Sequence, residues 1–220
     1  MSTLSAPGAG RAPPSFATLV LLSVTSILTL NMVLPSLGNL RADFGVSFGA
    51  ASLVVSLYML ATAGLQVVVG PMSDIWGRRP VILISLGLFA LASVGCALAP
   101  DFASFLACRI VQAAVISANV LSRAIVRDTS DGPDAAARLA LIGMTLALGP
   151  MLAPSIGGLL DEAFGWRATF WLFALAGVAL LAWSWRDLGE TAPGGGQGIA
   201  AQIRAYPALL RDGLFWSYTA

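Results

Sequence analysis

Apolar runs of about 20 residues recur along this chain, and they constrain its fold more than any other feature. The runs cover residues 16–37, 50–71, 80–99, 102–125, 137–160 and 166–185. At a rise of about 1.5 Å per residue, a helix of that length crosses a hydrocarbon core of about 30 Å. The runs lack the alternation typical of strands, and helices satisfy their own backbone hydrogen bonds in lipid. The pattern predicts an all-α membrane protein with six transmembrane helices.

Composition supports the bilayer as the solvent for this chain. Hydrophobic residues make up 57% of the 220 residues and charged residues 10%, whereas soluble globular domains carry roughly 25% charged residues. A soluble fold of this length has too little interior to bury so much apolar surface. The net charge of +1 offers no basic surface for nucleic acid. We therefore expect the lipid bilayer as a partner, and no nucleic acid.

The N-terminus raises the alternative of a secretory signal peptide. Residues 1–15 are rich in Pro, Gly, Ser and Ala and carry one charge, Arg11. The apolar run at 16–37 is longer than the 7–15 residues typical of a signal peptide core, and it is long enough to span a membrane. We predict a retained helix preceded by a disordered cytoplasmic segment, residues 1–15.

Arginine placement predicts the orientation of the bundle. The chain has no Lys and no His. With a cytoplasmic N-terminus, nine arginines fall on the cytoplasmic side: Arg11, Arg78, Arg79, Arg123, Arg127, Arg138, Arg186, Arg204 and Arg211. The outer segments hold only Arg41 and Arg167, and Arg109 lies within a run. The positive-inside rule therefore predicts a multi-pass protein of the cytoplasmic (inner) membrane with its N-terminus in the cytoplasm.

The C-terminal part of the chain indicates a linker and a further helix. Residues 186–213 include a polar, Gly-rich stretch typical of a flexible linker. Residues 214–220 begin another apolar run. We predict a six-helix bundle at 16–185, a cytoplasmic linker at 186–213 and the start of a truncated seventh helix at 214–220, so we expect the chain to be a fragment.

Polar residues on the fourth run indicate a cavity. All eleven acidic residues lie in loops or at the edges of runs, which leaves Arg109 as the deepest ionisable side chain. A charge near the middle of a bilayer costs about 2.5–3.5 kcal/mol. Arg109 shares one helical face with Gln112, Asn119 and Arg123, because steps of three and four residues return to the same side. We expect this stripe to face a polar cavity; the alternative is that Arg109 extends to the outer interface.

Two other runs carry weaker polar signals. Asn31 lies in the middle-to-outer part of the first run. It is a candidate for the substrate or proton pathway, although it could instead hydrogen-bond to a neighbouring helix. Ser52, Ser56 and Gln66 repeat along the second run and fit a cavity or a helix–helix contact equally well.

The loop between the second and third runs combines glycines, an acid and two arginines. Gly70 allows close helix approach, and Gly77 predicts a turn with positive φ. Asp74 is an acceptor suited to a helix N-terminus, and Arg78 and Arg79 follow it. A plain basic loop would satisfy the positive-inside rule without this Gly and Asp spacing. The spacing therefore indicates more than charge bias alone.

These motifs resemble those of the major facilitator superfamily. The loop is similar to the family signature G-x-x-x-D-x-x-G-R-R through Gly70, Asp74, Gly77, Arg78 and Arg79. Arg109 and Gln112 are similar to its R-x-x-Q signature. The fifth run is similar to the antiporter signature G-x-x-x-G-P-x-x-G-G through Gly149, Pro154, Gly157 and Gly158, with Ala153 in place of a Gly. The segment from Arg123 to Asp128 resembles the Bcr/CflA branch of drug:proton antiporters, named for bicyclomycin and chloramphenicol resistance.

The resemblance implies a fold and a function. The fold is the N-terminal half of a twelve-helix bundle, made of two inverted three-helix repeats, with substrate between this half and a missing second half. The function is multidrug efflux of small amphipathic compounds by alternating access, in exchange for protons. The resemblance also implies that the loop with Asp74 is a gating motif on the cytoplasmic side. Members of the branch commonly carry an Asp where this chain has Asn31, which leaves proton coupling open. The alternatives are a facilitator, a differently coupled exporter, or a non-transporting fragment.

Catalysis is poorly supported. The chain has no His, no Gly-rich nucleotide loop and no Ser or Cys beside a plausible base. Cys96 and Cys108 lie in apolar runs and are expected to pack as free thiols. We therefore expect no enzyme activity, no cofactor and no metal site.

Overall fold

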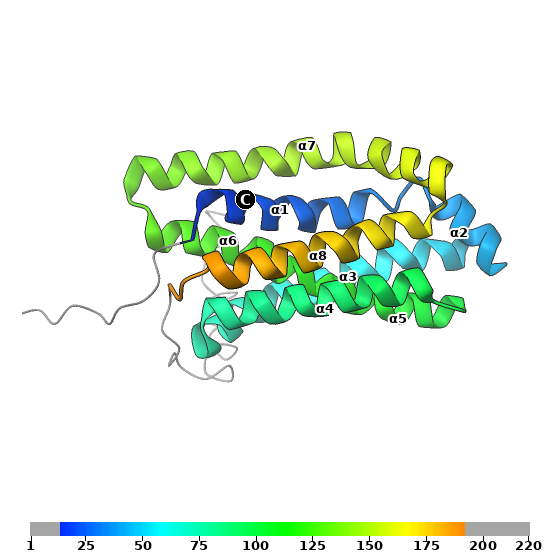
Figure 1. Cartoon of the computed structure of the whole chain (residues 1–220), viewed down its shortest axis with the longest axis horizontal. Coiled ribbons are helices and arrows are strands. Elements are labelled where there is room, and N and C mark those ends of the chain that lie inside the picture. The colour runs from blue at the N-terminus through cyan, green and yellow to red at the C-terminus, as the bar shows by residue number, and fades with distance from the viewer. Residues whose placement is uncertain (1–13, 192–220) are drawn as a thin grey trace, which may run out of the picture.

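The structure is a computed structural model that describes residues 14–191, and within this range the chain forms helices and no strand (Figure 1). In chain order they are α1 (Phe16–Asn31), α2 (Leu37–Phe44), α3 (Phe48–Trp76), α4 (Arg78–Leu98), α5 (Phe102–Gln112), the 3₁₀ turn η1 (Ala113–Val115), α6 (Ile116–Thr129), α7 (Gly132–Phe164) and α8 (Arg167–Asp187). Because α5, η1 and α6 are continuous, the fourth run crosses as one rod. Five of the rods are long and apolar enough to cross a membrane, and α1 is a shorter apolar helix.

The predicted all-α class is confirmed. Apart from the first, the predicted runs agree with the helices to within five residues at each end. Of the predicted segment at 1–15, residues 1–13 lie outside the described residues. The predicted linker lies outside them from residue 192 onward, as does the predicted seventh helix at 214–220. Arg186 and Asp187, assigned to the linker, belong to α8.

The first span is shorter than predicted. The helix α1 ends at Asn31, a turn follows, and the short polar helix α2 begins at Leu37. Pro35 explains the break, because proline lacks the N–H that a continuing helix needs and disfavours helical backbone in the residue before it. The prediction of one helix across 16–37 was therefore wrong at its C-terminal end.

The helix contacts show two inverted repeats. The first repeat holds α1 to α4 and the second α5 to α8. The second helix of each repeat packs on the first helix of the other: α3 packs on the fourth rod, and α7 packs on α1. The third helices, α4 and α8, pack on each other, and the first helices, α1 and the fourth rod, meet where α1 contacts α6. Exchanging the repeats returns the same set of contacts, as expected for two copies of one three-helix unit.

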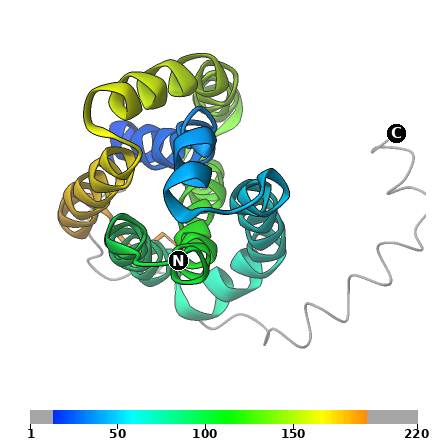
Figure 2. The same ribbon diagram turned by 90° about the vertical axis from the view of Figure 1, so that its right-hand side faces the viewer.

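The bundle has two chemically distinct ends. One end carries α2 and the loops before α5 and α8, and it holds a cluster of aromatic rings that includes Phe44, Phe105, Trp166 and Phe170. We call it the aromatic end; it faces the viewer in Figure 2. The other end carries the α3–α4 and α6–α7 loops and the end of α8. We call it the arginine-rich end.

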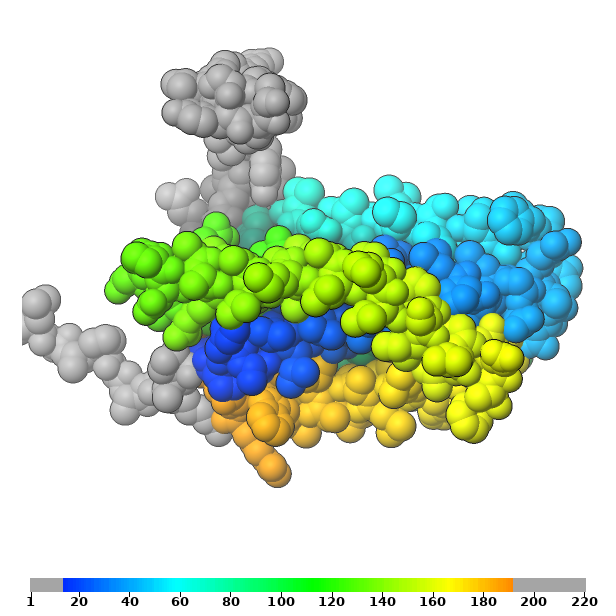
Figure 3. All heavy atoms as spheres, turned by 90° about the horizontal axis from the view of Figure 1, so that it is seen from above, coloured from blue at the N-terminus to red at the C-terminus, as the bar shows by residue number. Residues whose placement is uncertain are grey.

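Burial differs sharply between the helices. In α4 and in the α5–α6 rod, 61% and 56% of the most apolar stretch is buried, against 17% in α3 and 11% in α7. Figure 3 shows α7 lying over α1 with its outer face uncovered. Large apolar side chains cover this face, among them Met144, Leu148, Met151, Leu152 and Leu159. Since water would not solvate such surfaces favourably, α3 and α7 present faces for lipid or another apolar element.

Candidate functional site

A groove lies between α1, α3, α6 and α7. Its volume is about 850 Å³. Its polar lining residues are Ser26, Asn31, Tyr58, Thr62, Gln66, Asn119, Arg123 and Arg127. Aliphatic side chains such as Ile27, Leu30, Met59, Val120 and Leu146 form the rest of its wall. The groove therefore combines apolar walls with hydrogen-bonding groups, which is the composition of many small-molecule sites.

Arg109 is sealed inside the bundle. Its side chain has no exposed surface. One guanidinium nitrogen donates to the Thr29 carbonyl at 2.8 Å, and another donates to Gln112 Oε1. The Tyr58 ring lies against the guanidinium, with its centroid 4.1 Å from the central carbon. These contacts hold the buried charge with charge-assisted hydrogen bonds and a cation–π contact.

Gln112 continues this polar cluster. It is fully buried, and its Nε2 donates to Ser93 Oγ at 2.7 Å. Ser93 in turn donates to the Phe89 carbonyl at 2.7 Å. The chain of hydrogen bonds links α1, the fourth rod and α4, so the R-x-x-Q motif connects three helices of this half.

The predicted polar stripe of the fourth rod is divided. Asn119 and Arg123 line the groove, whereas Arg109 and Gln112 are enclosed. The expectation that all four face one cavity is therefore corrected, and so is the alternative that Arg109 reaches the interface. The 3₁₀ turn η1 lies between the two pairs, and its three residues per turn rotate the downstream face by roughly 60° relative to an ideal α-helix. The Tyr58 ring lies against Arg109 of the upstream pair.

Several buried polar atoms at the groove lack a hydrogen-bond partner among residues 14–191. They are Ser26 Oγ, Tyr58 Oη and Asn119 Oδ1. Asn31 also lines the groove, but its Nδ2 donates to the Ile27 carbonyl at 2.9 Å. Orphaned buried polar groups are uncommon in native proteins, so these atoms are candidates to bind water or a ligand. Tyr58 stood out in no sequence motif, and only its place between Arg109 and the groove identifies it.

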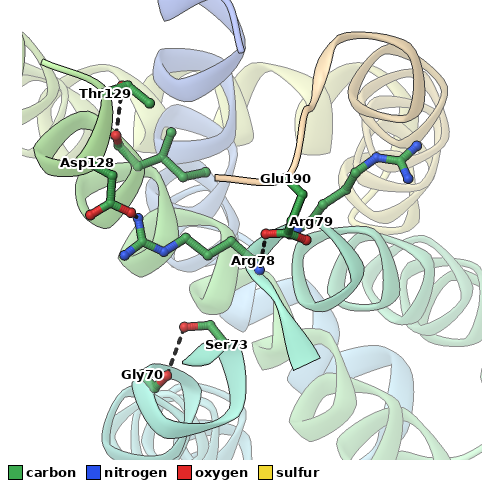
Figure 4. A network of polar contacts seen from close by, with 8 residues as sticks. Gly70, Ser73, Arg78, Arg79, Asp128, Thr129 and Glu190 are labelled. Atoms are coloured by element: carbon green, nitrogen blue, oxygen red, sulfur yellow. Dashed lines mark hydrogen bonds and ion pairs between the residues drawn. The ribbon is translucent and has the colours of Figure 1, made fainter. Parts of the chain in front are cut away.

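The predicted gating motif forms a network at the arginine-rich end (Figure 4). Gly77 has φ of +88°, which confirms the turn expected there. The Arg78 side chain forms an ion pair with Asp128 at the end of α6. Arg79 donates to the Trp185 carbonyl on α8 at 3.1 Å. The α3–α4 loop is thereby tied to both α6 and α8.

Glu190 occupies the place predicted for Asp74. Its carboxylate accepts from the backbone N–H groups of Arg78 and Arg79 at 2.9 and 3.3 Å, so it caps α4. Asp74 is exposed at the end of α3. The assignment of the helix N-terminus to Asp74 was therefore wrong: it rested on the closeness of Asp74 to Arg78 in the sequence, and Glu190 caps α4 instead.

 Glu190 lies 112 positions after Arg78 in the chain. The packing of α8 on α4 brings it to the start of α4.

The other glycine of the motif has a different environment from the one predicted. A Cβ added to Gly70 would meet nothing within 4 Å, so no close approach to another helix occurs there among residues 14–191. A Cβ on Gly77 would lie 2.5 Å from Glu190 Oε2. The small residue is therefore required at Gly77, both for its positive φ and for the Glu190 cap.

The antiporter motif forms the contact between α7 and α1. A Cβ on Gly157 would overlap the Met32 carbonyl, and one on Gly149 would overlap the Ile27 side chain. Ala153, which replaces a family Gly, is fully buried on the same face. Gly158 lies beside Pro35, and Pro154 lies within the helix. The small face lets α7 dock closely where α1 ends.

Polar pairs close the aromatic end. Arg167 forms an ion pair with Asp43, and Trp166 Nε1 donates to the same carboxylate at 3.1 Å. The hydrogen bond from Arg167, followed by that from Trp166, lowers the pKa of Asp43. Asn39 donates to Asp161 at 2.9 Å. Within residues 14–191 no group of three His, Cys, Asp or Glu side chains could hold a metal ion.

Comparison with known proteins identifies the family. The profile of the Major Facilitator Superfamily matches residues 19–220. This chain belongs to that superfamily. It is therefore a multi-pass membrane protein of a transporter family, and its groove and its two inverted repeats are features of that fold.

Two curated relatives are similar over most of the chain. YdgK, an MFS-type transporter of Bacillus subtilis, is 34% identical over 90% of this chain and 51% of its own length. The multidrug resistance protein MdtL of Escherichia coli is 37% identical over 74% of this chain and 42% of its own length. The chain thus spans about half the length of the curated relatives it matches.

Solved structures share the fold. The human organic anion transporter MFSD10 superposes with a TM-score of 0.72 at 26% identity, over 89% of this chain and 54% of that one. A bacterial homologue of the human lysosomal transporter Spinster superposes with a TM-score of 0.68 at 17% identity, over 92% of this chain and 50% of that one. The second likeness concerns the fold alone.

Proposed function

We propose that this chain is the N-terminal half of a drug-efflux transporter of the drug:proton antiporter type, close to the Bcr/CflA branch. It exports small amphipathic compounds across the cytoplasmic membrane by alternating access. The observation that carries the proposal is the groove between α1, α3, α6 and α7, where orphaned polar atoms meet apolar walls. The multidrug resistance relative MdtL supports it.

A second six-helix half completes the site in this proposal. The helices α3 and α7 border the groove, and they are the least buried of the membrane-length helices. Their uncovered apolar faces suit a second half that closes the groove. The chain spans about half the length of its relatives, which leaves room for that half.

The arginine-rich end faces the cytoplasm in this proposal, following the positive-inside rule. Its network of Arg78, Asp128 and Glu190 joins α4 to α6 and to the segment after α8. Asp74 lies exposed beside it, where it can contact the second half. The motif then acts as a gate that holds one conformation of the transporter.

Proton coupling requires an acid from outside the groove wall of this half. The lining residues include Asn31, Asn119 and two arginines but no carboxylate. Under the lead proposal the second half supplies the acid. A facilitator or a differently coupled exporter on the same fold remains the second candidate, favoured by Asn31 in the place of the branch's Asp.

The proposal is tested by transport into inside-out vesicles from cells that lack their own efflux pumps. We expect the complete protein to accumulate chloramphenicol when a proton gradient is imposed, and residues 1–220 alone to accumulate none. Co-expression of residues 1–220 with the second half as separate chains should restore uptake. Saturable uptake by residues 1–220 alone would contradict the two-half proposal, and no uptake of any amphipathic drug by the complete protein would contradict efflux.

A further inference from the structure

The charges at the groove are of one sign. Arg123 and Arg127 line it, and no carboxylate does. Within residues 14–191 the salt bridges join Arg78 to Asp128 and Arg167 to Asp43, so neither uses Arg123. Asp128, the acid next to Arg127 in sequence, is therefore engaged elsewhere. Arg123 is half-buried and Arg127 is exposed, so Arg123 is the less exposed of the two positive groups that the groove offers to a ligand.

The hydrogen-bonding groups beside it add a second requirement. Tyr58 is 2% exposed and Asn119 is 6% exposed, and both line the groove with an orphaned oxygen. A phenol hydroxyl can donate, whereas an amide oxygen only accepts. A ligand that satisfies both atoms carries an acceptor and an N–H or O–H donor. Ser26 provides another hydroxyl from α1.

The aliphatic part of the groove wall favours a ligand with an apolar body. Ile27, Met59, Val120 and Leu146 supply aliphatic surface from all four helices. A small hydrophilic anion would leave this surface in contact with water, whereas an aromatic or aliphatic body would cover it. The sealed guanidinium of Arg109 takes no part, because it is fully buried against the Tyr58 ring and is not among the residues that line the groove.

We propose that the groove binds amphipathic organic anions that carry a hydrogen-bond donor. Arg123 pairs with the acidic group, the Tyr58 hydroxyl donates to the ligand, and Asn119 Oδ1 accepts from its N–H or O–H. This inference rests on the proposed transport function and names the substrate class of the same groove. It adds to the proposed class of small amphipathic compounds a preference for ligands that carry a negative charge.

A matched pair of probes separates charge from apolar character. The anion 8-anilinonaphthalene-1-sulfonate and the neutral N-phenyl-1-naphthylamine share the same rings and the same N–H and differ by the sulfonate. Equilibrium binding is measured with the complete protein in nanodiscs, with empty nanodiscs subtracted. Transport is measured separately in inside-out vesicles.

We expect Arg123→Gln to raise the Kd for the sulfonate about tenfold, as for the loss of one charge-assisted contact, and to change the Kd for the neutral probe less than about twofold. Arg123→Lys should retain most of the sulfonate affinity. The control is Arg138→Gln, which removes an equally half-buried arginine from α7 that is near Phe16; it should change neither Kd.

The outcomes distinguish this inference from the function beneath it. Equal losses of both probes in Arg123→Gln, or no loss of the sulfonate, would overturn the anion site. Sulfonate binding that depends on Arg123, without transport of either probe, would contradict efflux and leave the site standing. Transport of the neutral probe without binding of the sulfonate would support efflux and overturn the anion site.

Discussion

The two parts of the fourth rod carry the same kinds of side chain in opposite settings. In α5, Arg109 and Gln112 are fully buried and bound to named partners. In α6, Asn119 and Arg123 line an open groove, and the Asn119 oxygen has no partner among the described residues. The difference shows that one rod holds an arginine sealed by neighbouring helices and a second arginine that lines the groove, and the second is the one we propose meets the ligand.

The two arginines differ in what replaces the hydration of their charge. A buried charge is tolerated only when hydrogen bonds and aromatic contacts replace its hydration, and Arg109 has both. Arg123 keeps access to water through the groove, so it needs no fixed partner. We therefore expect removal of the sealed group to damage the fold and removal of the open group to damage binding.

The largest effect expected from this comparison concerns Arg109. Arg109→Ala leaves Gln112 Oε1 and the Thr29 carbonyl without their donor and opens a cavity under Tyr58. Each orphaned buried acceptor costs about 1–3 kcal/mol, so we expect loss of most folded protein and of all transport. Size-exclusion yield and thermal stability of the complete protein measure this.

Arg123→Ala is the matched comparison on the same rod. It should fold with nearly unchanged thermal stability, because Arg123 is half-buried and forms none of the salt bridges of residues 14–191. Similar thermal stabilities for the two variants would break the distinction between a sealed and an open arginine.

The second prediction extends the comparison to α7. Gly157 is sealed against the Met32 carbonyl, whereas a Cβ on Gly143 would meet nothing within 4 Å. Gly157→Ala should destabilise the protein by about 1–3 kcal/mol through overpacking. Gly143→Ala should be neutral or stabilising by up to about 1 kcal/mol. The check is the thermal unfolding of both variants; equal effects would show that the small face of α7 is not a packing contact.

Much of this fold could be predicted from the sequence, and the limits have identifiable causes. Long apolar runs predict the helices because they depend on local composition, while the orientation drawn from arginine placement stays a prediction. The end of α1 at Asn31 depends on Pro35 and was missed because the run continues apolar beyond it. The sealing of Arg109 depends on Tyr58 and Thr29, which come from other helices. Glu190 could not be linked to α4 until α8 was packed on it.

The third prediction concerns the arginine-rich end, where Arg78 forms an ion pair and Arg127 lines the groove. Asp128→Asn removes the partner of Arg78, whose side chain is only 12% exposed. We expect a change in stability of about 1 kcal/mol or less and a fall in transport of up to about fivefold, because the pair biases the gate more than it holds the fold. The control is Asp131→Asn, an exposed acid of the α6–α7 loop. An equal fall in the control would indicate a general charge effect.

The smallest effect concerns Asn31, which tests whether the Arg109 charge reaches the groove. Asn31→Asp places a carboxylate in a partly apolar wall. If Arg109 is sealed, the apolar part of the wall disfavours the charged form of the new acid. Transport should then depend more steeply on pH between about 5 and 7, with the acid protonated as the pH falls. An unchanged pH profile in vesicles would mean that a nearby cation holds the pKa down.

The central claim, a sealed cluster beside an open groove on one rod, is tested most directly by thiol accessibility. In the complete protein with Cys96 and Cys108 replaced by alanine, single cysteines are placed at Asn119 in the groove and at Ser93 in the buried cluster. A small water-soluble methanethiosulfonate reagent is applied to inside-out vesicles, and labelling is followed by mass spectrometry. The account predicts rapid labelling of Asn119→Cys, slowed by bound drug, and no labelling of Ser93→Cys in transport-active protein. Labelling of Ser93→Cys at a similar rate, or no labelling of Asn119→Cys, would contradict it.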